Sequence, residues 1–234
     1  MIESVNNDKI KEYSKLNDKK YRDLSDEFIV EGSHLVEEAR KRDIIVEIFS
    51  LDDVDGATKV SYNVMKKLSN LSTPPNILAV CKKLEEKKPF GNILILDDVQ
   101  NPLNLGTIIR SSVAFGIDTI IASTNTVDVY NDKVIRGSEG MIFNINYIKA
   151  DLAKIIPSLS EYTIYTTNVT TGESLDKINI DKPYAIIVGN EGAGVSDEVA
   201  SYATNTIYIP MNDKCESLNV SIATSIILYE FSRK

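Results

Sequence analysis

The chain has 234 residues, of which 43% are apolar and 26% charged, so it is long enough for one large or two small globular domains and is not a disordered or fibrous protein. It contains only two cysteines and one histidine, which excludes a disulfide framework and a zinc site of the usual ligands. The net charge of −8 argues against a simple polyanion binder, because such proteins usually have a basic surface.

The composition also bears on where the protein is located and whether it binds a metal. With so few cysteines, the default compartment is the reducing cytoplasm, and the N-terminus has no basic start followed by an apolar run. No stretch approaches the roughly 20 apolar residues of a membrane-spanning helix. We therefore expect a cytoplasmic protein that does not bind a membrane and has no metal site.

The charge is distributed unevenly along the chain. Residues 1–90 hold 16 of the 26 Lys and Arg against 17 Asp and Glu, whereas residues 91–234 hold 10 against 17. The net charge is therefore −1 in the first part and −7 in the second. Taken alone, such a distribution is better explained by solvated helix faces than by a binding surface.

The first part, residues 1–82, alternates helical and strand patterns and predicts a small α/β domain. Helices are expected over 8–20, from Ser33 as N-cap through 39, and around 64–68, and strands at 28–30, 44–49 and 77–80. A charged run ending at Pro89 follows, and its position between two patterned regions predicts a linker over residues 83–91.

The second part, residues 92–234, has a longer alternation of strands and helices. Residues 93–96 are a nearly continuous apolar run, which is typical of a strand buried on both faces of a parallel sheet. Further strands are expected at 119–122, 142–147, 163–166, 184–188 and 206–209, and a helix at 103–115. The last helix, from Leu218 to Phe231, is apolar over most of its circumference, so it must be buried in the core or against another subunit.

The first of three polar clusters spans residues 97–110, where a buried strand ends and a helix begins. In open α/β sheets, ligands bind beyond the carboxyl ends of the strands. Asn104 and Arg110 are six residues apart, which on a helix leaves them about 120° out of line. They converge only if Asn104 lies in the turn before the helix. The spacing alone favours turn chemistry and an ordinary surface arginine.

The second cluster, residues 187–196, places three glycines after a strand, so that backbone can approach a ligand closely. The spacing does not match the dinucleotide fingerprint, and the lysine of a P-loop is absent. Glu191 lies within the glycine run, where its carboxylate would repel phosphate and better suits a cationic ligand or the orientation of an arginine. A plain turn is the alternative.

The third cluster, residues 209–221, joins the last strand to the last helix. Ser217 and Asn219 are polar at the start of an otherwise apolar helix, and capping of that helix by Ser217 would explain the serine. Cys215 lies in the same segment, but no histidine is near it in sequence to activate it as a nucleophile.

Taken together and in this order, the three clusters resemble the motifs of the SpoU (TrmH-type) RNA 2′-O-ribose methyltransferases of the SPOUT superfamily. The matching segments are Asn104-Leu105-Gly106 with Arg110, then Val188-Gly189-Asn190-Glu191-Gly192, then Ile209-Pro210-Met211 with Glu216-Ser217-Leu218-Asn219-Val220-Ser221. The resemblance covers residues 92–234. The first part resembles, more loosely, the small substrate-binding domain of many family members.

The resemblance implies an α/β fold in which a parallel sheet ends in a deep trefoil knot, preceded by a small α/β RNA substrate-binding domain. It also implies S-adenosyl-L-methionine as cofactor, bound mostly by backbone groups around Gly189, Ile209 and Leu218. Family members are homodimers, which would explain the apolar final helix. The implied substrate is ribosomal or transfer RNA, methylated on a ribose 2′-hydroxyl.

Residue roles follow from the resemblance position by position. Asn104 and Arg110 match the first motif, Glu191 the second, and Ser217 and Asn219 the third. A guanidinium is essentially always protonated, so we expect Arg110, fixed by neighbours such as Glu191, to position the hydroxyl or phosphate and to stabilise the developing alkoxide. A SPOUT enzyme acting on a base nitrogen and a non-catalytic RNA-binding homologue are the alternatives.

Overall fold

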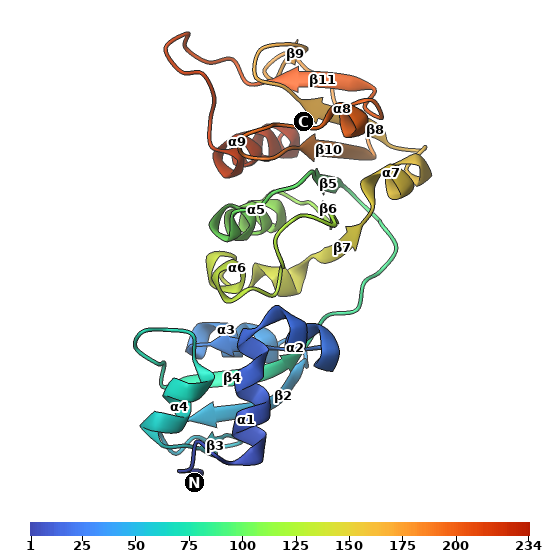
Figure 1. The fold of residues 1–234 in the computed structure, drawn as a ribbon. Helices are drawn as coiled ribbons and strands as arrows, with labels where there is room; N and C mark the ends of the chain where they lie inside the picture. Colours follow the sequence, from blue (N-terminus) through green and yellow to red (C-terminus); the bar gives the residue numbers. More distant parts are fainter. The chain divides into compact units, whose positions relative to one another are not determined.

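The computed structural model describes all 234 residues and divides into two compact units (Figure 1). Unit 1 comprises residues 1–85 and 130–143, and unit 2 comprises residues 86–129 and 144–234. No helix is long and apolar enough to cross a membrane.

Unit 1 is built on a four-stranded sheet in the order β1 (Glu27–Glu31), β4 (Ile77–Lys82), β2 (Ile45–Ser50) and β3 (Thr58–Lys59). β4 is antiparallel to both β1 and β2, and β2 is parallel to β3. The helices are α1 (Asp8–Ser14), α2 (Lys19–Ser25), α3 (Ser33–Arg40) and α4 (Tyr62–Leu68). The core under α1 and α4 is apolar and includes the buried side chains of Phe49, Met65 and Leu78.

Two helix boundaries in unit 1 differ from those expected from the sequence. The continuous helix over residues 8–20 is wrong: after α1 comes a 3₁₀ turn, η1 (Lys15–Asn17), and α2 then starts separately behind Asp18. Asp18 has an extended backbone and its side chain accepts from the N–H of Lys20, so it acts as a new N-cap. Ser33 is the first residue of α3, and Gly32 occupies the cap position with φ +98°.

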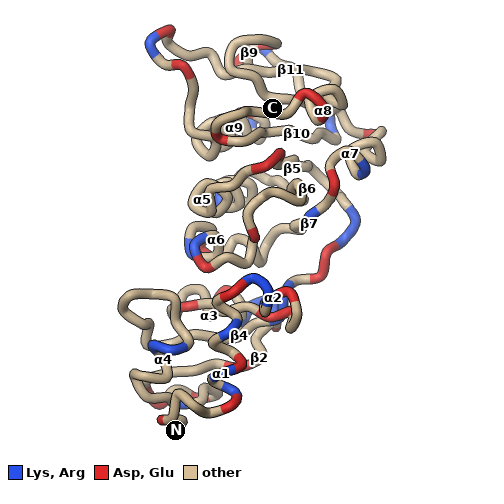
Figure 2. Tube along the Cα trace, in the orientation of Figure 1, with Lys and Arg blue, Asp and Glu red and all other residues tan.

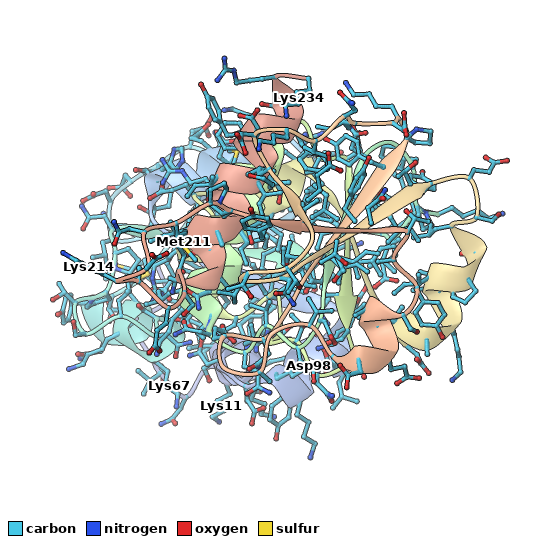
Figure 3. All side chains as sticks on the ribbon, turned by 90° about the horizontal axis from the view of Figure 1, so that it is seen from above. Lys11, Lys67, Asp98, Met211, Lys214 and Lys234 are labelled. Carbon is cyan, nitrogen blue, oxygen red and sulfur yellow. The ribbon has the colours of Figure 1, made fainter.

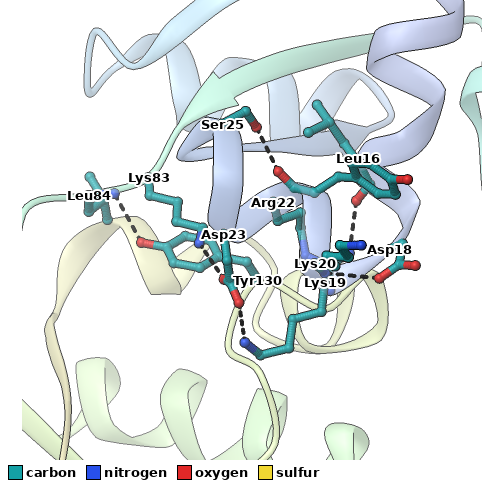
Figure 4. Close-up of polar contacts among 11 residues, drawn as sticks. Leu16, Asp18, Lys19, Lys20, Arg22, Asp23, Ser25, Lys83, Leu84 and Tyr130 are labelled. Atoms are coloured by element: carbon teal, nitrogen blue, oxygen red, sulfur yellow. Dashed lines mark hydrogen bonds and ion pairs between the residues drawn. The ribbon is translucent and has the colours of Figure 1, made fainter.

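Residues 130–143, which contain α6 (Asp132–Gly137), lie in unit 1 although they follow the first strands of unit 2 in sequence. The ring of Phe28 packs against Tyr130 and Phe143, with ring centroids 4.7 and 6.1 Å away. The hydroxyl of Tyr130 accepts from the N–H of Leu84 at 2.9 Å (Figure 4).

An ion-pair cluster on α2 lies beside this contact (Figure 4). Asp23 pairs with Lys19 on the same helix and with Lys83, 2.8 Å away, just past the end of β4. Burial raises the pKa of Asp23, but the hydrogen bonds from the two lysines outweigh it and hold the pKa at about 2. Asp23 thus fixes the end of β4 to α2.

Unit 2 contains a seven-stranded sheet in the order β7-β6-β5-β10-β8-β11-β9, and every neighbouring pair is parallel. Its strands are β5 (Ile93–Leu96), β6 (Thr119–Ser123), β7 (Asn146–Ala150), β8 (Thr163–Thr167), β9 (Glu173–Ser174), β10 (Tyr184–Val188) and β11 (Asn205–Tyr208). Its helices are α5 (Pro102–Ala114), α7 (Leu152–Ile155), α8 (Asp197–Ala200) and α9 (Val220–Ser232), with a 3₁₀ turn η3 (Ile156–Ser158). The expected α/β fold with a parallel sheet is confirmed.

The strand expected over 142–147 is wrong at its start. Residues 141–144 form a 3₁₀ turn, η2 (Met141–Asn144), and β7 begins only at Asn146. The apolar side chains of Ile142 and Phe143 are buried, so they gave a strand-like pattern without a strand. Residues 83–90 have no helix or strand, but the N–H of Lys87 donates to Asn146 Oδ1 at 2.9 Å and that of Phe90 to Thr119 Oγ1 at 3.2 Å.

In the C-terminal part of unit 2, the order of the strands in the sheet differs from their order in the chain. β11 lies between β8 and β9 and is hydrogen-bonded to both, although β9 and β10 precede it in the chain. A long loop of residues 209–219 then leads to α9, which packs along α5 through a 2.7 Å hydrogen bond between Ser111 and Ser225 (Figure 1). Leu228 and Phe231 of α9 are buried, whereas Ile222, Ile226 and Tyr229 are 52%, 39% and 48% exposed.

Candidate active site

A cavity of about 470 Å³ opens at the carboxyl ends of β8, β10 and β11. Pockets for small ligands have volumes of about 300–1,000 Å³, so this one is large enough for a nucleoside-sized molecule. Its walls are the ends of these strands, the loop of residues 189–196, the loop of residues 209–219 and the first turns of α9. The lining includes Gly189, Ile209 and Leu218, predicted to hold the cofactor, and also Glu191 and Ser217.

The loop of residues 189–196 is folded tightly on itself. A Cβ at Gly189 would lie 2.0–2.2 Å from the backbone of Gly194 and Val195, so only glycine fits there. The backbone of Asn190 exchanges hydrogen bonds with that of Gly194 at 2.9 and 3.0 Å, and Asn190 Oδ1 accepts from the N–H of Gly192. The backbone that approaches Gly189 is therefore the loop's own.

The same loop is fastened to the end of β5. Asp97, only 7% exposed, accepts through Oδ2 from both the N–H and the hydroxyl of Ser196, at 2.8 and 2.7 Å. Asn190 Nδ2 donates to the carbonyl oxygen of Asp98 at 2.8 Å. Two neighbouring strand ends thus hold the loop in one position.

Glu191 makes a third fastening, to the start of α5. Its Oε1 accepts from Asn104 Nδ2 and from the N–H of Asn101, both at 3.0 Å, and its Oε2 accepts from the N–H of Gln100 at 3.3 Å. Partial burial raises the pKa of Glu191, but these hydrogen bonds to the charged form outweigh it and leave the pKa below its ordinary value. The carboxylate is used to orient an amide and two backbone groups, and no contact joins it to Arg110.

Asn104, which is buried, continues this chain of hydrogen bonds. Its Oδ1 accepts from Asn219 Nδ2 at 3.1 Å, and Asn219 Oδ1 accepts from the N–H of Ser221 at 2.9 Å as the N-cap of α9. The structure therefore brings together one residue from each of the three sequence clusters. The cap of α9 is Asn219 and not Ser217, which corrects the capping interpretation of Ser217.

Arg110 lies apart from this network. Asn104 is inside α5 and not in a preceding turn, so the two side chains leave the helix about 120° apart. Arg110 is exposed and is the only charged residue of α5. Its guanidinium makes no ion pair or hydrogen bond within the chain. Arg110 is thus available to a partner from outside.

The loop of residues 209–219 has few contacts with the rest of unit 2. Met211 and Lys214 mark it in Figure 3. Apart from those of Asn219, its hydrogen bonds are internal, such as those from the N–H of Lys214 to Asn212 Oδ1 at 3.0 Å and from Cys215 Sγ to the carbonyl oxygen of Ser217 at 3.3 Å. Ser217 is exposed and its hydroxyl has no hydrogen bond within the chain.

Sequence reasoning missed two polar residues of the site. Thr166, on β8, lines the cavity and is 6% exposed, yet its Oγ1 has no hydrogen-bond partner. Asp97 was seen only as part of a cluster, although it anchors Ser196. Both lie at the carboxyl end of a parallel strand, and that position was the available signal.

Two family models match the chain. One described as the SpoU rRNA methylase family matches residues 91–229, and one described as an MRM3-like substrate-binding domain matches residues 7–79. These ranges together include nearly all of the chain.

The chain is also similar to known proteins over its full length. It is 35% identical to the 23S rRNA (guanosine(2553)-2′-O)-methyltransferase RlmP of Bacillus subtilis, over 97% of each chain. A crystal structure of an RNA 2′-O ribose methyltransferase matches 99% of this chain and 98% of its own with a TM-score of 0.84 and 28% identity. An AdoMet-bound rRNA methyltransferase from Sinorhizobium meliloti matches 99% of this chain and 97% of its own with a TM-score of 0.88 and 26% identity.

Proposed function

The chain belongs to the SpoU rRNA methylase family, and from this premise we propose that it methylates a ribose 2′-hydroxyl of ribosomal RNA with the residues described above. It is an RNA 2′-O-methyltransferase that uses S-adenosyl-L-methionine. We assign roles to these residues from one observation. Hydrogen bonds link Glu191, Asn104 and Asn219, and they join the three motifs beside the cavity.

The residues around the cavity fit the cofactor. The unpartnered Oγ1 of Thr166 offers a buried hydrogen-bonding group, and Gly189, Ile209 and Leu218 line the same space. Bound there, S-adenosyl-L-methionine would supply a methyl group that its sulfonium already activates. No metal is then needed, so the reaction is expected to proceed in chelator.

The polar residues divide into two roles. Glu191 and Asn219 hold both ends of the Asn104 amide, which keeps this side chain in one orientation at the start of α5. Arg110 is the group left free to meet RNA: it positions the phosphate or the 2′-hydroxyl and stabilises the alkoxide that develops as the proton leaves. Ser217 presents a second free polar group, its hydroxyl, from the loop of residues 209–219.

The fold proposal includes a deep trefoil knot in unit 2. Its support is the position of β11 between β8 and β9, two strands that the chain forms earlier. A C-terminal segment that passes through the loop made by residues 163–188 would account for this order. Because knots are rare in proteins, strand order alone is weak support for one. Membership of the SpoU family is the second observation that supports the knot.

A homodimer is the proposed assembly. Ile222, Ile226 and Tyr229 lie at positions i, i+4 and i+7 of α9 and form an exposed apolar stripe. Light scattering should report twice the chain mass of 26.0 kDa. Ile226→Glu should give a monomer that still folds, and a wild-type monomer at micromolar concentration would contradict the dimer.

For the domains, we propose that residues 1–82 are the RNA substrate-binding domain, 83–91 a linker and 92–234 the methyltransferase domain, of which residues 130–143 pack within unit 1. The match of residues 7–79 to a substrate-binding family model supports it. We place the protein in the cytoplasm, in keeping with its two unpaired cysteines.

The function is tested by mapping 2′-O-methyl groups in ribosomal RNA. Purified protein, labelled S-adenosyl-L-methionine and unmethylated ribosomal RNA should give label on one nucleotide, resistant to alkaline cleavage as a 2′-O-methyl group is. Transfer RNA serves as the parallel substrate. Label on a base, or no transfer to either RNA, would contradict the proposal.

A further inference from the structure

One long stretch of unit 1 has no acidic residue. The chain contains 34 Asp and Glu, yet none occurs from Gly56 to Leu84. The same stretch contains five lysines, Lys59, Lys66, Lys67, Lys82 and Lys83. In a protein with a net charge of −8, this is a local departure from the overall balance.

Helix α4, within this stretch, has one buried and one exposed face. Val64, Met65 and Leu68 are fully buried against the core of unit 1. The opposite face consists of Tyr62, Asn63, Lys66 and Lys67, all exposed, and Figure 2 shows α4 with basic but no acidic positions. Tyr62 is 53% exposed, which leaves much of its ring open to solvent.

The two lysines of α4 differ from most other lysines of unit 1. Lys9, Lys11, Lys19, Lys41, Lys59 and Lys83 each pair with a carboxylate. Lys66 and Lys67 have no ion-pair partner and no hydrogen bond through their ammonium groups. Their positive charge is therefore not compensated within the chain.

The loop that follows α4 is polar and is held in place from inside. Glu31, 8% exposed, accepts from the hydroxyl of Ser69 and, at 3.1 Å, from the N–H of Asn70. The exposed side chains of this loop are Asn70, Ser72, Thr73 and Asn76. The carboxylate that contacts this loop is thus buried, while amides and hydroxyls are exposed.

We propose that the exposed face of α4 and the loop of residues 69–76 are a contact surface for single-stranded or looped RNA. Lys66 and Lys67 neutralise phosphates, a base stacks on the ring of Tyr62, and the loop side chains donate hydrogen bonds to the backbone. This inference rests on the proposed function, since it assigns part of the RNA-binding surface of the same enzyme. It also explains how an acidic chain can bind a polyanion.

The test measures RNA affinity as a function of salt for Lys66→Ala/Lys67→Ala. Each lost phosphate contact to a single strand lowers the slope of log K against log salt by about 0.7, so the double variant should lose about 1.4 in slope. At physiological salt we expect the dissociation constant for ribosomal RNA to rise about tenfold. The matched control is Lys9→Ala/Lys41→Ala, which removes the same charge from ion-paired positions and should change the slope by less than half as much.

The aromatic contact is tested with Tyr62→Ala and Tyr62→Phe. Loss of the ring should weaken RNA binding at least fivefold, whereas phenylalanine keeps the ring and should bind like wild type. In Lys66→Ala/Lys67→Ala and in Tyr62→Ala, KM for RNA should rise while kcat and S-adenosyl-L-methionine affinity stay within twofold of wild type. If wild type methylates RNA but the α4 variants bind it unchanged, the surface is wrong. If wild type neither binds nor methylates RNA, the proposed function fails instead.

Discussion

The two loops that line the cavity are built in opposite ways. The loop of residues 189–196 is hydrogen-bonded through Ser196 and Asn190 to the segment that follows β5, and through Glu191 to α5. The loop of residues 209–219 bonds only within itself until Asn219 caps α9. The first is a fixed wall formed during folding, and the second can adjust to what enters the cavity.

Because of this difference, we expect different residues of the site to support folding and methyl transfer. The fastened residues have their polar groups satisfied within the chain, so their substitution should disturb folding and cofactor binding. Arg110 and Ser217 have free polar groups, so their substitution should disturb transfer with little change in stability. The following substitutions test that division.

The largest effect is expected at Gly189. In Gly189→Ala, the new Cβ would lie within 2.2 Å of backbone that cannot move aside, and overpacking of this kind costs about 3 kcal/mol. Thermal unfolding should shift down sharply, and calorimetry should detect no S-adenosyl-L-methionine binding. Gly192→Ala is the control, because its nearest atom would be 3.6 Å away and its unfolding should match wild type. Equal behaviour of the two variants would show that the loop is not fixed.

Arg110→Ala should have the largest effect on the reaction without an effect on the fold. Loss of one preorganised electrostatic group lowers a rate by roughly 10²-fold. Single-turnover transfer with saturating RNA measures this, while the melting temperature and cofactor affinity should stay as in wild type. Arg110→Lys should rescue poorly, since an ammonium lacks the planar fork of a guanidinium. A rate within threefold of wild type for Arg110→Ala would make it a surface arginine.

Glu191→Gln should weaken cofactor binding at pH 7 by about tenfold, because the amide group of glutamine cannot accept from both backbone donors. The pKa of Glu191 is lowered in the folded protein, so its stabilising effect is present above about 4.3, the ordinary glutamate pKa, and is lost as the pH falls through the lower folded value. Affinities of wild type and variant should converge on acidification. A difference that persists unchanged at the lowest pH at which both proteins fold would remove the carboxylate from this role.

The smallest difference is expected between two serines, one in each loop. Ser196→Ala leaves Asp97 without a hydroxyl donor and should lower the free energy of unfolding by about 1 kcal/mol. Ser217→Ala removes an unbonded hydroxyl and should change it by less than about 0.5 kcal/mol. Denaturant titration of both variants gives the comparison. Ser217→Ala as destabilising as Ser196→Ala would mean that the second loop is also fastened.

The inner strands of unit 2, such as β5 (residues 93–96) and β10, were predictable because their apolar runs are buried on both faces. The two-residue strand β9 was not predicted, since Glu173 and Ser174 form no apolar run. The separation of Asn104 from Arg110 was not predictable, because it depends on whether α5 begins at Pro102 or only after Asn104. Nor could Glu191 be paired correctly. Two of its three partners are backbone groups about ninety residues away, and backbone donors leave no trace in a sequence.

The excursion of residues 130–143 has a consequence for how this protein can be cut or recombined. Because that segment belongs to unit 1, the chain passes between the units at three places and not one. A single break after residue 90 would leave Tyr130 and Phe143 without Phe28, their aromatic neighbour. If two related genes were joined at that point, residues 1–90 would come from one parent. Residues 130–143, which complete the core of unit 1, would come from the other. Any functional hybrid must therefore take residues 130–143 from the same parent as residues 1–85.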